Sequence, residues 1–247
     1  KHAFLDCKKL QRISIPSSCI SIEEGAFKDC ISLSSVQFGT NKSSPKMKYI
    51  RKEAFYNCCS LESIEIPLSV IIICESAFMN CRKLQNIKIF SDDENGVELI
   101  GKNAFKNCTS LKSFYLPPSC VIIGPSSFMN CTSLEKIECK CINLASIQCR
   151  AFFNCSSLKC FELKNLELKK LHDFYTLKYG YNDKDIDTWS YYSNFCIGAE
   201  AFMNCDSLTE VVIEDNLKEI DTIEIDSEGE LLFKYPPKLN KCLKLRI

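Results

Sequence analysis

The chain has 247 residues, of which 46% are hydrophobic and 25% charged, a balance typical of a folded protein and not of a disordered one. Lys and Arg together number 31, as do Asp and Glu, so no overall basic charge exists to attract nucleic acid or an anionic membrane. No run of about 18 apolar residues occurs, which argues against a membrane span. Because the chain starts at Lys1 with no initiator Met or signal segment, we expect a processed or trimmed piece.

A repeated motif organises the chain from its first residues. The fragment Phe-x-x-Cys-x-x-Leu occurs eight times, and Ala or Ser precedes each Phe. Ile stands five residues before every Phe from the second copy onward, and apolar residues follow each Leu at the third and fifth positions. Columns kept in register over so many copies predict a stacked repeat array. The Phe residues of the copies are Phe4, Phe27, Phe55, Phe78, Phe105, Phe128, Phe152 and Phe202.

Each unit divides into three predicted elements. The Leu-x-x-Ile-x-Ile segment alternates like a short strand with one buried face. Pro follows this segment in three units, at Pro16, Pro67 and Pro117, and stops strand pairing because it lacks an N–H. The Ile-x-x-x-Ala-Phe-x-x-Cys segment has apolar spacings of three to five residues, which favour one or two helical turns. One unit cannot bury its own apolar side, so the units must stack.

The step from Phe152 to Phe202 is 50 residues and departs from the repeat. We interpret residues 173–195 as an inserted loop, because no Phe-x-x-Cys-x-x-Leu frame survives there; a degenerate repeat is the alternative. Its aromatic side chains are of the kind that anchors interfaces, although they can equally fold the loop back on the array. The candidate partner-binding residues in this loop are Tyr179, Tyr181, Trp189, Tyr191 and Tyr192.

Residues 61–81 (LESIEIPLSVIIICESAFMNC) and 111–131 (LKSFYLPPSCVIIGPSSFMNC) resemble the BspA-like (Treponema pallidum type) leucine-rich repeat. The resemblance covers about residues 3–213. It implies an α/β repeat fold: a leucine-rich-repeat solenoid with a parallel β-sheet on one face and short helical or 3-10 turns behind. It also implies protein binding or adhesion, with no family-wide catalytic residues.

We therefore expect a single solenoid over residues 1–247. Its repeats occupy about residues 1–172 and 196–225, on either side of the inserted loop. Residues 222–241 resemble the hairpin-like inserts of the same family and lead into a partial further repeat.

Cysteine is the compositional outlier, with 18 residues, eight of them in the repeat column. We interpret the column cysteines as small buried apolar side chains, with sequential disulfides as the alternative. Cys139-Lys-Cys141 with Cys149 lacks the paired arms and histidines of a zinc site, so no metal or other cofactor is expected. Unpaired thiols favour an intracellular home. The glycosylation sequons at Asn41, Asn107, Asn130 and Asn154 keep a surface or secreted protein open.

The strand segments offer a second candidate surface. Their outward side chains include Glu65, Lys88, Tyr115, Glu138 and Glu162, which we predict to contact a partner; a merely solvated face would look similar. With two histidines, no convergent carboxylate pair and no Gly-rich phosphate loop, no enzyme is expected. The predicted function is a protein-interaction scaffold in a larger assembly. The alternatives are a surface or secreted adhesin and a plain spacer, and the partner's identity and the oligomeric state stay open.

Overall fold

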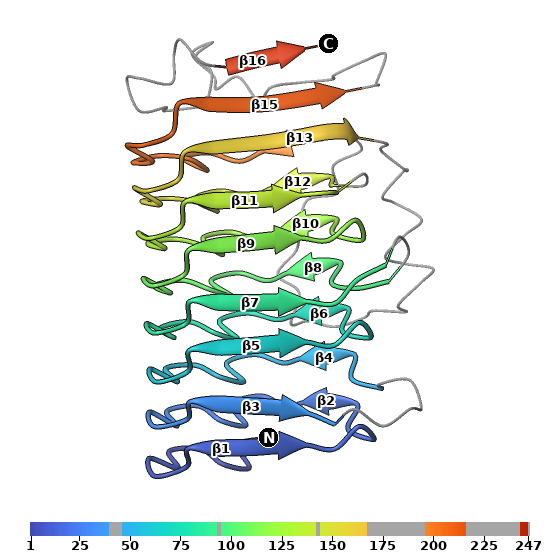
Figure 1. Cartoon of the computed structure of the whole chain (residues 1–247), viewed down its shortest axis with the longest axis vertical. Helices are drawn as coiled ribbons and strands as arrows, with labels where there is room; N and C mark the ends of the chain where they lie inside the picture. The colour runs from blue at the N-terminus through green and yellow to red at the C-terminus, as the bar shows by residue number, and fades with distance from the viewer. Residues whose placement is uncertain (40–45, 93–94, 142–143, 167–195, 216–242, 247) are drawn as a thin grey trace.

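The chain winds into coils that stack along the long axis of the molecule (Figure 1). Each coil contributes a long strand to one side and, in most coils, a two-residue strand to the other. The computed structural model describes residues 1–39, 46–92, 95–141, 144–166, 196–215 and 243–246.

The long strands are β1 (Arg12–Ile15), β3 (Ser35–Phe38), β5 (Ser63–Ile66), β7 (Asn86–Ile89), β9 (Ser113–Leu116), β11 (Lys136–Cys139), β13 (Cys160–Leu166), β15 (Glu210–Asp215) and β16 (Leu243–Arg246). The short strands are β2 (Ser21–Ile22), β4 (Tyr49–Ile50), β6 (Ile72–Ile73), β8 (Leu99–Ile100), β10 (Ile122–Ile123), β12 (Ser146–Ile147) and β14 (Cys196–Ile197).

All pairings between neighbouring coils are parallel. The long strands pair as β1–β3, β5–β7 and β9–β11–β13–β15–β16, and the short strands form one seven-stranded sheet from β14 to β2. Period-2 alternation holds in β5, where Ile64 and Ile66 are buried while Ser63 and Glu65 are exposed. The predicted parallel-strand solenoid is therefore confirmed, with strands on two sides of each coil and not on one.

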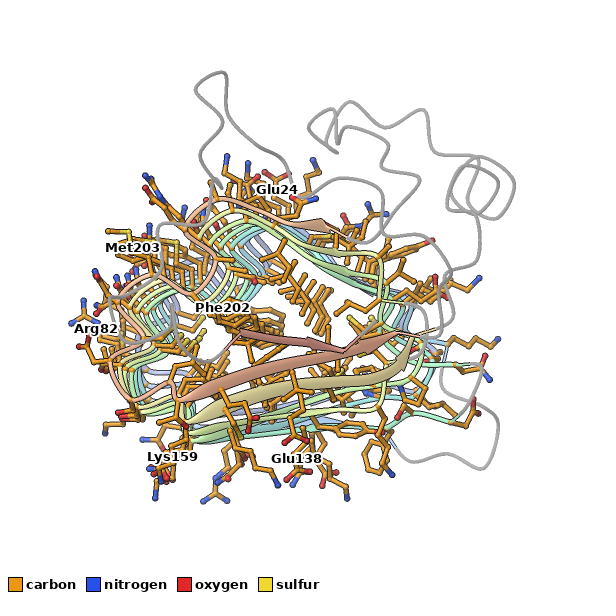
Figure 2. All side chains as sticks on the ribbon, turned by 90° about the horizontal axis from the view of Figure 1, so that it is seen from above. Glu24, Arg82, Glu138, Lys159, Phe202 and Met203 are labelled. Carbon is orange, nitrogen blue, oxygen red and sulfur yellow. The ribbon has the colours of Figure 1, made fainter. Side chains whose placement is uncertain are left out.

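The phenylalanine column fills the interior between the long strands on one side and the short-strand sheet on the other. Adjacent rings of this column lie 5.1–5.3 Å apart between centroids and are tilted by only 3–16°, close to the spacing of paired strands. Phe114 adds an edge-on contact, with its centroid 4.7 Å from that of Phe128. Figure 2, viewed along the stack, places Phe202 inside the coil, where it is 3% exposed.

The segment around each Phe is held by two alternating sets of hydrogen bonds. Within one coil, Ala26 N–H donates to the Glu23 carbonyl at 3.1 Å and Cys30 N–H donates to the Phe27 carbonyl at 3.1 Å. Between coils, Phe27 N–H donates to the Ala54 carbonyl at 2.8 Å. The segment is therefore a ribbon of turns joined sideways to the next coil. It is not a helix, because a helix would direct every N–H along its own axis.

The predicted helical or 3-10 turns are thus not found: the structure contains no helix among the described residues. The physical reason is a left-handed backbone at two positions per coil. Gly25 has φ 58° and Asp29 has φ 61°, two residues before and after Phe27. Residues in this region interrupt a right-handed helix, and Gly, Asn and Asp tolerate it best. The equivalent residues after Phe are Asp6, Asp29, Asn57, Asn80, Asn107, Asn130, Asn154 and Asn204.

The coils of Phe152 and Phe202 are direct neighbours despite their separation in the chain. Their rings stack with centroids 5.3 Å apart, and Phe152 N–H donates to the Ala201 carbonyl at 2.8 Å. The intervening loop 173–195 and the hairpin-like segment 222–241 lie outside the described residues. Beyond that segment, β16 pairs in parallel with β15.

The eight column cysteines are free thiols, so no sequential disulfides join the coils, and the interpretation as buried apolar side chains is confirmed for all but half-buried Cys7. They also donate hydrogen bonds. Cys58 Sγ lies 3.2 Å from the Phe27 carbonyl oxygen of the preceding coil, and the same contact, at 3.0–3.2 Å, recurs from Cys30 to Cys205. Burial raises the pKa of the Cys131 and Cys205 thiols to about 12, which keeps them protonated and able to donate.

Truncating a ring in the middle of the column should destabilise the protein strongly. Phe78 is fully buried and stacked on both sides, so we expect Phe78→Ala to lower the free energy of unfolding by about 3–5 kcal/mol in urea titrations. Phe4 is 39% exposed and stacks only on Phe27, so Phe4→Ala is the matched control and should have a much smaller effect. Equal losses for the two variants would contradict a stacked interior column.

Stability should also fall in mild alkali. A buried thiol has a higher pKa when folded than the value of about 9 expected when unfolded, so its contribution is complete below pH 9 and is lost as the pH rises toward 12. Each such thiol adds a slope of about 1.4 kcal/mol per pH unit in that window.

The measurement is the free energy of unfolding by urea at pH 7, 9 and 10. Because other groups also titrate there, the informative comparison is with Cys131→Ala, whose decline above pH 9 should be shallower by the slope of one thiol. Parallel curves for the two proteins would show that Cys131 ionises as readily in the fold as in the unfolded chain.

Candidate interaction surface

The outward side of the long strands, here called the strand face, presents two rows of side chains. Successive strand residues point to opposite sides, so the first and third residues of each four-residue segment face away from the core. Figure 2 shows Glu138 on this side, pointing away from the interior. The first row is Arg12, Ser35, Ser63, Asn86, Ser113, Lys136, Cys160 and Glu210. The second row is Ser14, Gln37, Glu65, Lys88, Tyr115, Glu138, Glu162 and Val212.

The structure brings five of the predicted contact residues into the second row. Glu65 is opposite Lys88 in the β5–β7 pair, and Tyr115 is opposite Glu138 in the β9–β11 pair. Glu162 follows on β13, which pairs with β11 (Figure 1). All five come from consecutive coils, and all but Tyr115 are exposed.

Ion pairs cross this face between and within coils. Lys88 Nζ lies 3.4 Å from Glu65 Oε1 and 4.3 Å from the centroid of the Phe90 ring. Lys136 Nζ lies 2.9 Å from Glu138 Oε1, and this hydrogen bond raises the pKa of Lys136. Exposed pairs of this kind contribute little to stability, so their charges can turn to a partner at small cost.

Tyr115 differs from its neighbours in the row. It is half-buried and packs against the main hydrophobic core, while Lys88 and Glu138 on the flanking strands are exposed. A ring fixed by the core and bordered by charges has the composition of an interface anchor, because little side-chain entropy remains to be lost on binding.

The loop residues predicted to bind, Tyr179, Tyr181, Trp189, Tyr191 and Tyr192, lie outside the described residues. The candidate surface therefore consists of the strand face.

The short-strand sheet carries a second set of outward-facing apolar residues, which was not predicted from the sequence. Ile72, Leu99 and Ile122 point away from the core yet are only 7–8% exposed, and they form a separate hydrophobic cluster with Val121 and Ala145. The signal was available, because the residue before the repeated Ile is large and apolar in four successive units. Their burial distinguishes this side from the exposed strand face.

Among the described residues, no three or more His, Cys, Asp or Glu side chains gather in a way that suits a metal ion. The same part of the chain holds no helix with the length and apolar character needed to cross a membrane.

Comparison with known proteins identifies the repeat. The model of the BspA type leucine-rich repeat region matches residues 1–96, 48–179 and 98–225, with six copies. The chain belongs to this family. The resemblance carried by residues 61–81 and 111–131 is thereby confirmed.

Solved structures of the leucine-rich-repeat type are similar to the chain. A Treponema pallidum leucine-rich repeat protein is 24% identical, with a TM-score of 0.48, over 84% of this chain and 69% of that one. A Bacteroides ovatus leucine-rich repeat protein is 22% identical, with a TM-score of 0.45, over 86% and 58%. The pneumococcal vaccine antigen PcpA is 19% identical, with a TM-score of 0.41, over 96% and 66%. The chain thus spans about 58–69% of the length of these proteins. No curated protein sequence matches it significantly.

Proposed function

We propose that this chain is a protein-binding module that presents the strand face to a protein partner within a larger assembly. The observation that carries the proposal is the second row of the strand face, where four exposed charged residues and a core-anchored Tyr115 follow one another on five adjacent coils. A rigid stack holds these side chains at fixed spacing, which suits recognition of an extended or flat protein surface. Membership of a repeat family associated with binding supports this assignment over catalysis.

Within this function, the free thiols of the cysteine column favour an assembly scaffold over a surface adhesin. The column cysteines are free and serve as hydrogen-bond donors, an arrangement most easily kept in a reducing compartment. Three of the four sequon asparagines have a structural use of their own. Asn107 Nδ2 donates to Asn80 Oδ1 at 2.7 Å, and Asn130 and Asn154 extend this ladder coil by coil. Paired cysteines or glycans on the protein from its natural source would instead support the adhesin.

We also propose that residues 173–195 are an insertion that adds contacts to a partner. The support is the direct stacking of Phe152 on Phe202, which gives no place to a further coil between them. The aromatic composition of the insertion, including the chain's single Trp189, is that of interface anchors.

Reversing the charges of the second row should remove binding. In the variant Lys88→Glu with Glu138→Lys the net charge is unchanged, but the two charges on either side of Tyr115 are exchanged. We expect recovery of wild-type partners from an extract of the source cells, quantified by mass spectrometry on immobilised protein, to fall about ten-fold or more.

The matched control is Arg82→Glu with Asp206→Lys, which changes the same number of charges at exposed positions that follow the cysteine column. Figure 2 places Arg82 on the turn side, away from Glu138. This control should keep its partners. A deletion of residues 173–195 tests the proposed contacts of the insertion independently of those of the strand face. If the row variant recovers as much partner as the control, the strand face is not the binding surface.

A further inference from the structure

Three cysteines meet where β11 ends, away from the cysteine column. Cys139 is the last residue of β11, and Cys141 follows two residues later. Cys120 comes from the preceding coil, and its thiol is within hydrogen-bonding reach of the Cys141 thiol. Cys141 Sγ also lies 3.3 Å from the Pro117 carbonyl oxygen. These contacts place two thiols beside Cys141, one from each side.

Cys139 has an environment unlike that of the column cysteines. It is only partly buried, whereas Cys120 and Cys141 are buried. The backbone N–H of Cys141 donates to Cys139 Sγ at 3.4 Å, while the Cys141 thiol lies beside the same sulfur and directs its one hydrogen at the Pro117 carbonyl oxygen. Donors directed at a sulfur stabilise its thiolate.

The pKa values of the pair agree with this geometry. Hydrogen bonding by Cys141, through its side chain and its backbone N–H, lowers the pKa of Cys139, although burial opposes the shift. Burial raises the pKa of Cys141, which therefore stays a thiol while its neighbour ionises. The cluster is not arranged for a metal ion among the described residues, so the chemistry open to it is that of a thiol pair.

We propose that Cys139 and Cys141 form a modification site for small hydroperoxides, in which Cys139 is the attacking thiol and Cys141 the resolving one. The proposal is independent of the partner assigned to the strand face. It rests on two adjacent sulfurs, one partly buried and supplied with a backbone N–H donor and one buried beside it.

The reaction proceeds in two balanced steps. The Cys139 thiolate attacks the terminal oxygen of hydrogen peroxide, the S–O bond forms as the O–O bond breaks, and hydroxide leaves and takes up a proton to become water. Cys139 is oxidised by two electrons to the sulfenic acid. The Cys141 sulfur then attacks the Cys139 sulfur, its proton leaves with the hydroxyl as a second water, and a disulfide forms.

The chain offers a direct test, because Lys140 separates the two cysteines and trypsin cleaves after it. The intact wild-type chain is treated briefly with hydrogen peroxide, its remaining thiols are alkylated, and a non-reducing tryptic map is recorded. We expect a species that links the peptide ending at Lys140 to the one beginning at Cys141, lighter by two hydrogens than the two peptides together. Fragmentation distinguishes a bond to Cys141 from one to Cys149, which lies in the same peptide.

A variant identifies the attacking sulfur. In Cys141→Ser, dimedone should trap a sulfenic acid on Cys139 several-fold faster than on Cys149, which is exposed and serves as the internal control. The wild-type map needs no variant and stands even if Cys141→Ser folds poorly. A disulfide that joins Cys120 to Cys141, a bond to Cys149, or no oxidation of Cys139 ahead of Cys149 would each overturn the assignment.

Discussion

A ladder of backbone hydrogen bonds between coils sets the geometry on which the other features depend. The N–H of each column Phe donates to the carbonyl of the residue that precedes the next Phe, as Phe78 does to Ala104 at 2.7 Å, and the residues two before and two after Phe make equivalent bonds. This ladder fixes the distance between coils at the point where the chain turns. At that distance identical side chains meet, so rings stack, each thiol reaches a Phe carbonyl, and Asn amides join in a ladder. The same residue type recurs along a column because each of its positions has equivalent surroundings in the coil above and the coil below.

The columns were predictable because they are periodic. The register of Phe, Cys and Leu predicted the interior, and the alternation of Ile64 and Ile66 with polar residues predicted the strands. The segment before each Cys was predicted wrongly, since apolar spacings of three to five residues occur in helices and in stacked turns alike. The distinguishing signal was Asp29 and its Asn equivalents, which favour the left-handed backbone that a helix excludes. A strand of two residues, such as β6, has no period to detect.

The strand face was predictable as a set of outward residues but not as a row. Whether Glu65 meets Lys88 and Tyr115 meets Glu138 depends on the register between strands, which the unequal lengths of the units conceal. The same limit applies to the thiols. The sequence shows Cys139 and Cys141 close together, but which one is buried follows from the coil beneath, through the contact of Cys141 with the Pro117 carbonyl.

The unequal lengths of the units have a consequence for how such a protein can diversify. The chain runs from Phe38 to Tyr49 in one coil and only from Ile66 to Ile72 in the next, yet both strand registers are kept. Residues 40–45, 93–94, 142–143 and 167–195 all fall between a long strand and the following short strand. Among the described strands from β2 to β15, the connection from a long strand to the next short one varies in length, while the connection from a short strand to the next long one does not. Lengthening a connection adds little entropy loss, so this part of the coil is where added residues disturb the stack least.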